Sequence, residues 1–498
     1  MPNFCGKPLM IVVAFVAAAG CAGADEEDAA TFTADQFADR LTDVIHSIAE
    51  SYIHEMDAGE LCRWAVNGLE RKAGKAIPPG IAARLAKIHD PSLPEMRRLL
   101  TDIAADAGGD LRSLADFAVK QLLGRLDGRT QLIEQDQTMN GGRVPLSTGI
   151  GVRLASDPAT GMIRIQYPFL HGPAHRAGLK AGDVITEIAY PKNEMPDGPP
   201  PGVDVFPTKD MSLDSAYWHL SGTIGKAVYL DVRRPGADKV LRFTVPRAQN
   251  VPESVFGVRR HNDDRWDHWL DGNRKIGYMR LATIRENTQK VMANEIAALR
   301  MQGMKALVLD LRGNASGLVY DGASIAEMFV GEAPLFTIRV RGEDDRFQGT
   351  PAKAHRDFPM ACLVNADTVG LAEVLAACLQ DNQRAAIVGE RTPGYASIEH
   401  YSFHGNDFYL RITAGVYLRP NGKKLDRIHP TGLRSDEWGV TPDKGYELVV
   451  SPKERDELRE HFEKQFEIRP PGRANEHRPV FKDRPLELAR EYLRRRTQ

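Results

Sequence analysis

The sequence predicts an α/β core preceded by a mostly β region, with helical regions at both ends of the chain. Between about residues 275 and 450, short apolar segments alternate with amphipathic ones, which favours βαβ units around a largely parallel sheet. Between about 143 and 250, short alternating strands are separated by turn residues. From about 25 to 135, and again after 451, the pattern is typical of helices.

The composition is ordinary for a globular protein and restricts the function only weakly. The 498 residues correspond to about three domains at roughly 150 residues each. Lys and Arg total 65 against 67 for Asp and Glu, and 42% of residues are hydrophobic. Wholesale disorder, a fibre and a polytopic membrane protein are therefore not expected. The near-neutral charge gives no reason to expect a nucleic-acid partner.

The N-terminus predicts export to the periplasm or cell envelope. The apolar run LMIVVAFVAAAG is too short to span a bilayer but has the length of a signal-peptide core. Ala22-Gly23-Ala24 would end a signal peptide over residues 1–24. Ala18-Ala19-Gly20-Cys21 resembles a lipobox without its usual Leu, so lipidation of Cys21 and soluble export both stay open. A buried N-terminal helix is the structural alternative.

The cysteines predict neither a metal site nor redox chemistry. Cys5 and Cys21 fall in the leader, and Cys62, Cys362 and Cys378 are widely spaced. No Cys-x-x-Cys pair occurs, and no spacing of His, Asp and Glu suits a metal, so we expect no metal and no cofactor. Buried, inert thiols are the expected state of the last three cysteines.

The first two regions are predicted as follows. Residues 25–142 are expected to be helical, with apolar spacings of three and four in DRLTDVIHSIAESYI and SLADFAVKQLLGRL. Residues 75–94 are rich in Pro and Gly and should interrupt the helices. In residues 143–250, GIGVRL pairs with MIRIQYP and KAVYLDVRR with VLRFTVPR as two hairpins, and the proline-rich residues 191–210 form a loop insertion.

In the third region, strands and helices alternate in order. The strands are IGYMRL, KALVLDL, PMACLVN and RAAIVGE, and the helices include TQKVMANEIAALRMQG and AEVLAACLQD. In parallel sheets, function usually lies at the carboxyl ends of the strands. Residues 312–317 and 365–370 occupy that position after two of the strands. The tail over residues 451–498 is charged and helical.

These segments, in this order, resemble the carboxyl-terminal processing (tail-specific) serine peptidases over nearly the whole mature chain. GIGVRL, PAHRAGLKAGDVITEI, LDSAYWHLSG and KAVYLDVRR are similar to that family's PDZ domain, over residues 143–250. KALVLDLRGNASG, ACLVNADTVGLAEVLAACLQDNQRAAIVGERTPGY and LRITAGVYLRPNGKK with GVTPD are similar to its core, over residues 251–450. The resemblance implies a crotonase-like α/β peptidase fold with an inserted PDZ domain. It also makes a homo-oligomer through the terminal helices an open expectation.

The family's catalytic residues do not carry over. Its serine nucleophile stands three residues before a glutamate that matches Glu373, which places the nucleophile position at Gly370. Its general-base lysine follows Gly-Glu-x-Thr-x-Gly, which places that position at Tyr395, and its glutamine four residues later is Glu399. No shift of register restores the pair, because no serine lies between residues 324 and 397 and no lysine between 353 and 423.

Physical reasons also disfavour catalysis at these positions. Gly370 has no side chain to attack with, and a tyrosine, with a reference pKa of about 10, is a poor base near neutral pH. A carboxylate such as Glu399 would raise the pKa of any nearby lysine. Thr368 and Ser316 are rival nucleophiles. Their structural alternatives are a helix N-cap for Thr368 and a plain loop hydroxyl for Ser316.

Binding is the function that the sequence leaves intact. Gly149, Ile150, Gly151 and Val152 stand where a PDZ domain captures a C-terminal carboxylate on backbone N–H groups. An occluded groove with a purely structural role is the alternative. The helix start near Gly370 could also offer free N–H groups to an anion such as a peptide carboxylate. Arg312, Gly313 and Asn314 match family residues and are expected to hold the core turn.

Three functions remain open. The first is an exported, PDZ-containing pseudopeptidase that binds polypeptide C-termini, unfolded protein or a partner protein, with membrane contact only through a lipid anchor. The second is an active endopeptidase that uses Thr368 or Ser316. The third is a structural envelope protein assembled through its terminal helices.

Overall fold

The computed structural model describes residues 32–134, 148–157, 160–191, 203–261, 265–315, 317–351, 354–404, 408–427, 437–465 and 481–497. The chain forms two compact units. Unit 1 comprises Met1–Gln135, Pro334–Thr350 and Gly394–Gly439, and unit 2 comprises Asp136–Ala333, Pro351–Pro393 and Val440–Gln498. Both units therefore draw on residues 251–450, the segment assigned above to a single core. The predicted leader with Cys21 lies outside the described residues.

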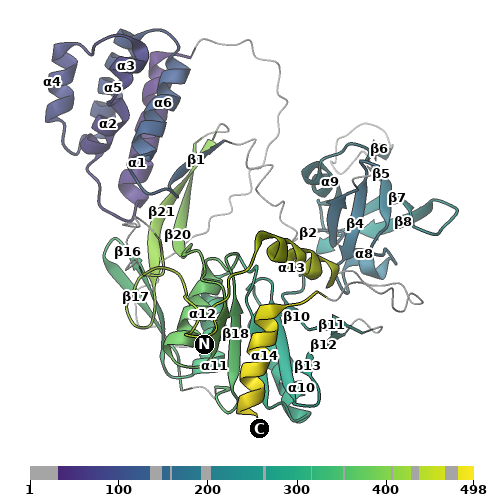
Figure 1. The fold of residues 1–498 in the computed structure, drawn as a ribbon. Helices are drawn as coiled ribbons and strands as arrows, with labels where there is room; N and C mark the ends of the chain where they lie inside the picture. The colour runs from purple at the N-terminus through teal and green to yellow at the C-terminus, as the bar shows by residue number, and fades with distance from the viewer. Residues whose placement is uncertain are drawn as a thin grey trace. The chain divides into compact units, whose positions relative to one another are not determined.

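Six helices form the N-terminal part of unit 1 (Figure 1). They are α1 (Ala34–Ser51), α2 (Ala58–Val66), α3 (Leu69–Ala73), α4 (Pro79–Lys87), α5 (Leu93–Ala107) and α6 (Leu111–Leu123). The helical prediction is confirmed from α1 to α6, although α4 lies inside the segment expected to interrupt the helices. Pro79 of α4 stands at the first helical position, where the missing N–H costs nothing and the fixed φ suits a helix. The helical prediction is wrong for Gln131–Glu134, which form a strand because they pair with Phe408–Leu418 later in the chain.

An antiparallel sheet completes unit 1. Its order is β1 (Gln131–Glu134), β21 (Phe408–Leu418), β16 (Pro334–Val340) and β17 (Glu343–Gln348), and β20 (Ser397–His404) also pairs with β21. Phe408, Leu410 and Ile412 of β21 share one hydrophobic core with the buried faces of the helices. Strands late in the sequence are thus covered by helices from its beginning.

Unit 2 contains the predicted parallel sheet. The order is β10 (Val255–Phe256), β14 (Ile276–Leu281), β15 (Ala306–Asp310), β18 (Met360–Val364) and β19 (Ala386–Gly389), with β13 (Trp269–Asp271) also on β14. β14, β15, β18 and β19 run parallel, as predicted. Every residue of β15 and β18 is buried, which explains their continuous apolar sequence.

Helices cover this sheet and position its strand ends. α10 (Thr288–Met301), α11 (Val319–Val330) and α12 (Leu371–Asp381) follow β14, β15 and β18 in the chain. α13 (Pro452–Gln465) and α14 (Arg484–Arg496) form the helical tail, and α14 lies against the sheet in Figure 1. Ala489 and Leu493 of α14 are buried against sheet residues that include Ile276 and Val308.

A second sheet in unit 2 is antiparallel. Its order is β3 (Val152–Ser156), β4 (Ile163–Pro168), β5 (Val184–Pro191), β7 (Ala227–Arg233) and β8 (Leu241–Pro246), with β6 (Val203–Pro207) also on β5. The helices α8 (Pro173–Arg176) and α9 (Leu213–Leu220) lie between its strands in sequence, and short ladders join β2 (Thr148–Gly149) to β9 (Ala248–Gln249) and β11 (Arg259–Arg260) to β12 (Trp266–Asp267). Both predicted hairpins form.

One prediction for this region is wrong in part. Strand β6 and its ladder to β5 lie inside residues 191–210, the segment predicted to be a loop insertion. The alternation of Val203, Val205 and Pro207 was hidden by the surrounding prolines. Residues 192–202 lie outside the described residues.

The described cysteines are buried thiols, as predicted. Cys62, Cys362 and Cys378 are free. Burial raises the pKa of Cys62 and Cys378 to about 12 and that of Cys362 well above its ordinary value. None of the helices in the described ranges combines the length and apolarity needed to cross a membrane.

Candidate functional site

The two predicted turns lie against each other at the carboxyl ends of β15 and β18. The Gly313 N–H donates to Asn365 Oδ1 at 3.1 Å, and the Val369 N–H donates to the Asn314 carbonyl at 2.8 Å. The Asn314 side-chain amide donates to the Leu281 carbonyl at 3.0 Å, which ties the turn to β14 as well. Both segments follow their strands, as the sequence predicted. Ser316 lies outside the described residues.

Thr368 is fastened inside this turn. Its fully buried hydroxyl accepts from the Asn365 N–H at 3.0 Å and donates to the Leu311 carbonyl at 3.1 Å. The N-cap of α12 is Gly370 and not Thr368, so the capping role expected of Thr368 is wrong. The hydroxyl joins the turn to the residue that follows β15.

Gly370 begins α12 in a conformation that favours glycine, with φ 65° and ψ −128°. An L-residue is strained in this part of backbone space. The Gly370 N–H donates to Glu373 Oε2 at 3.2 Å. The predicted anion site is therefore wrong for this N–H group, because a carboxylate of the chain itself already accepts from it.

Glu373 links the start of α12 to Thr392, in the segment that follows β19. It is fully buried, and the Thr392 hydroxyl donates to its Oε1 at 2.5 Å. The Val440 N–H donates to the Thr392 hydroxyl at 2.8 Å. Glu373, the residue from which the nucleophile position was counted, thus fixes the turn that contains Gly370.

Arg312 is the centre of a buried charge cluster behind the turns. Its guanidinium donates to Asp310 at 2.6 and 2.9 Å and to Asp483 with two bonds of 2.8 Å. The Tyr278 hydroxyl donates to Asp310 at 2.8 Å. Burial alone would raise the pKa of Asp483, but the Arg312 charge and its hydrogen bonds outweigh burial and hold that pKa below its usual value.

The cluster gives Arg312 a structural role at the end of β15. It also contains Asp483, which the sequence did not predict. Arg312 is 1% exposed, and its charge is compensated on both sides, as buried charges require. Asp483 lies 171 residues further along the chain. Its only sequence signal is its place as N-cap of α14.

Tyr395 and Glu399 belong to unit 1, whereas Gly370 belongs to unit 2. Tyr395 is 54% exposed, and the Arg129 guanidinium lies over its ring, 4.5 Å from the centroid. Glu399 in β20 accepts from the Tyr401 hydroxyl at 3.0 Å and lies 3.9 Å from the Arg411 guanidinium. The position predicted for a general base is therefore a tyrosine stacked on a cation.

Arg129 is held in that place by several partners. It forms an ion pair with Asp426, donates to Ser397 Oγ at 2.7 Å and donates to the Gly394 carbonyl at 2.5 Å. Asp426 is 5% exposed. No local sequence pattern marks Arg129 or Asp426, and neither was predicted.

The predicted peptide-binding residues come together where β2 leads into β3. Gly149 and Gly151 have positive φ angles of 138° and 76°, while Ile150 and Val152 are buried. A Cβ on Gly151 would lie 2.6 Å from Asn250 Oδ1, so this position needs glycine for space as well as for conformation.

β3 presents backbone groups at the edge of its sheet. In the described ladder it pairs only with β4. The Phe169 N–H donates to the Gly151 carbonyl at 2.8 Å, beside the pair Val152–Pro168. In an antiparallel ladder, a hydrogen bond in this position flanks a non-hydrogen-bonded pair. The N–H and C=O of Val152 therefore point away from β4. An added strand could form hydrogen bonds with these two groups.

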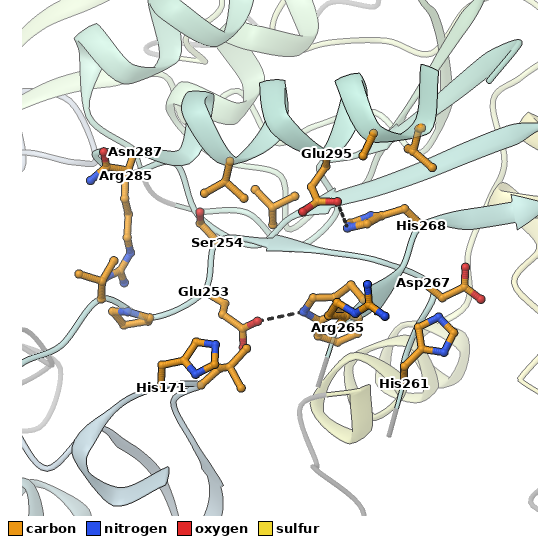
Figure 2. A pocket seen from close by; sticks show the side chains of 18 of the residues that line it. His171, Glu253, Ser254, His261, Arg265, Asp267, His268, Arg285, Asn287 and Glu295 are labelled. Atoms are coloured by element: carbon orange, nitrogen blue, oxygen red, sulfur yellow. Dashed lines mark hydrogen bonds and ion pairs between the residues drawn. The ribbon is translucent and has the colours of Figure 1, made fainter. Parts of the chain in front are cut away.

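A cavity of about 630 Å³ lies elsewhere in unit 2 (Figure 2). Glu253 on its wall accepts from Arg260 at 2.6 Å and from Trp266 Nε1 at 3.0 Å. Figure 2 also shows Glu295 pointing toward His268, 3.7 Å away. None of the predicted site residues lines this cavity. Among the described residues, no group of three or more His, Cys, Asp or Glu side chains is arranged to hold a metal.

Comparison with known proteins identifies the core. Residues 275–444 match the model of peptidase family S41. The match includes β14, β15, β18, β19 and both turns of the site, and it confirms the resemblance given by the sequence.

Relatives from bacteria extend the likeness beyond the core. The chain is 29% identical over 345 residues to a carboxyl-terminal-processing protease of Synechocystis sp., covering 67% of this chain and 73% of the relative. It is 26% identical over 328 residues to the carboxy-terminal processing protease CtpB of Bacillus subtilis, covering 65% and 63%. The solved structure of a photosystem II D1 C-terminal processing protease covers 83% of this chain and 93% of its own, at 23% identity and a TM-score of 0.43.

Proposed function

We propose that this chain is a catalytically inactive S41 peptidase homologue that binds polypeptide C-termini through a PDZ domain. We further propose that it is exported to the periplasm or cell envelope, as its N-terminal residues 1–24 suggest. The observation that supports inactivity most directly is Gly370, which occupies the start of α12 with φ 65° and has no nucleophile to offer.

The geometry of this turn supports the assignment of the nucleophile position. Other hydrolases present their nucleophile on a sharp, strained turn between a strand and a helix. Here β18 leads through such a turn to α12, and Glu373 holds it by accepting from the Gly370 N–H. The turn is present, and the side chain that would perform the chemistry is not.

No described residue near the turn replaces that side chain. A serine or threonine hydroxyl becomes nucleophilic only when a neighbouring base takes its proton. The Thr368 hydroxyl instead donates to the Leu311 carbonyl at 3.1 Å and is fully buried. At the other family position, Tyr395 lies under the Arg129 guanidinium, and tyrosine is a poor base near neutral pH.

The binding role rests on the second sheet of unit 2. PDZ domains hold a C-terminal carboxylate on successive backbone N–H groups while the peptide adds as a strand to a sheet edge. Gly149–Val152 would form the carboxylate loop, and β3 offers the edge, with Val152 backbone groups directed outward. The buried Ile150 and Val152 favour an apolar C-terminal residue.

Catalytic inactivity is tested with purified full-length protein and an unfolded polypeptide that ends in apolar residues, followed by mass spectrometry over many hours. We expect intact substrate from the native chain. The double substitution Gly370→Ser with Tyr395→Lys tests whether the scaffold can regain cleavage. Cleavage by the native chain that disappears in Thr368→Ala or Ser316→Ala would identify a replacement nucleophile and overturn the proposal.

The binding half is tested by fluorescence anisotropy on the same protein. A labelled peptide with a free apolar C-terminal residue should bind, and the same peptide with an amidated C-terminus should bind far more weakly, since the carboxylate is the group recognised. Equal binding of both peptides would contradict capture of a C-terminus.

A further inference from the structure

One side chain occupies the edge of β3 at the point where a ligand strand would pair. The Leu154 N–H donates to the hydroxyl of Tyr217, a residue of α9, at 2.8 Å. Leu154 itself is 4% exposed, and Tyr217 packs against the same hydrophobic core as Val152 and Leu154. This bond therefore joins α9 to the free edge of β3.

The position of this bond along β3 matters. Backbone groups two residues apart on a strand point to the same edge, and both Val152 and Leu154 direct theirs away from β4. A ligand whose last residue pairs near Val152 would place an earlier carbonyl opposite Leu154. That carbonyl and the Tyr217 hydroxyl would compete for a single N–H.

We propose that Tyr217 is a gate on the peptide groove, which a polypeptide C-terminus must displace before it can add to β3 as a strand. This inference rests on the proposed function of the groove. The last ligand residue can contact Gly149–Val152 while the hydroxyl stays in place, but the strand pairing that extends to Leu154 cannot. Opening replaces one hydrogen bond of Leu154 by another, so the gate lowers affinity without abolishing binding.

Tyr217→Phe tests the gate, because phenylalanine keeps the ring and its packing and removes only the hydroxyl. The matched control is Tyr229→Phe, a tyrosine of β7, which does not border β3. The probe is the labelled peptide with a free apolar C-terminus, and anisotropy titration of the full-length protein gives Kd. We expect Tyr217→Phe to bind roughly two- to tenfold more tightly than the native chain, a factor set by the net value of one hydrogen bond. Tyr229→Phe should bind like the native chain.

The outcomes separate this inference from the proposed function. Equal Kd values for the native chain and Tyr217→Phe, or weaker binding by Tyr217→Phe, would refute the gate and leave peptide binding intact. Binding by none of the three proteins would refute the proposed function and the gate with it. Hydrogen exchange gives a second readout without ligand, since the segment that contains Leu154 should exchange faster in Tyr217→Phe and unchanged exchange would contradict the gate.

Discussion

At the scale of single residues, buried hydrogen bonds hold the turn at the start of α12 around a glycine with positive φ. Gly370 holds φ 65° and ψ −128° at the start of α12. Glu373 and Thr392 still form the buried hydrogen bond that fixes this start. Glycine adopts this conformation without strain, so the residue at this position suits the turn. A side chain restored here would add strain as well as chemistry.

The first residue-scale prediction follows from that strain. Gly370→Ala should lower the free energy of unfolding by about 1–3 kcal/mol, the cost of holding an L-residue in this region. Urea unfolding followed by tryptophan fluorescence measures it. Gly272→Ala is the control, since Gly272 belongs to the same unit and a Cβ there meets nothing within 4 Å. A Gly370→Ala protein as stable as the native chain would show that the turn relaxes easily.

At the scale of elements, one aspartate connects a helix to the site. Asp483 accepts from the Leu486 N–H at 3.1 Å as N-cap of α14, and it also accepts from the Arg312 guanidinium. The docking of α14 on the parallel sheet is therefore coupled to the charge cluster at the end of β15. Packing of Ala489 and Leu493 supplies the apolar part of this contact.

The second prediction concerns Asp483 and pH. Its pKa in the folded protein lies below the usual value, because the Arg312 charge outweighs burial. Its ionised form therefore stabilises the fold above the unfolded pKa of about 3.9, and this stabilisation is lost as pH falls through the lower folded pKa. Asp483→Asn keeps an N-cap residue but should lower stability at pH 7 by about 2 kcal/mol, the value of a hydrogen bond to a charged group.

The same variant should also respond less to acid. As pH falls below about 4, the native chain loses the contribution of Asp483, whereas Asp483→Asn has none to lose. Urea unfolding at a series of pH values measures both effects. Asp456→Asn, which removes a surface carboxylate of an ion pair with Arg459, should change little. Parallel pH curves for the native chain and Asp483→Asn would contradict the coupling.

The elements also show which parts of the fold a sequence reveals. The strands β14, β15, β18 and β19 were predicted because each is a short, continuous apolar run, a local signal of burial on both faces. Strand β6 was missed among prolines, and α4 was missed because a proline at a helix start resembles a helix break. In the site, Gly370 could be located from the pattern around Glu373, whereas the Tyr217–Leu154 bond has no local signal.

At the scale of the whole molecule, the chain is interleaved rather than divided in order. Unit 1 is built from three separate segments, and residues of β21, near the C-terminal end of that unit, share one buried hydrophobic core with helices from the start of the chain. Such pairing between distant segments depends on tertiary packing that a single sequence does not display. The ion pair of Arg129 with Asp426 joins residues 297 positions apart within this unit.

This ion pair carries the last prediction. Asp426 is 5% exposed, and removing the partner of a buried charge costs far more than the pair contributes. Arg129→Leu should therefore lower the free energy of unfolding by about 3–5 kcal/mol. Adding Asp426→Asn removes the uncompensated charge, so the double variant should be more stable than the two single losses predict, with a coupling of about 1–3 kcal/mol.

A double-mutant cycle by urea unfolding measures that coupling. The control cycle is Arg411→Leu with Glu399→Gln, a pair in the same unit whose charged atoms are 3.9 Å apart and partly exposed, where we expect a coupling near zero. If Arg129 and Asp426 instead gave additive losses, the pair would not join the segments of unit 1. Arg129 would then act through its other contacts, which are the hydrogen bonds to Ser397 Oγ and the Gly394 carbonyl and the stacking on the Tyr395 ring.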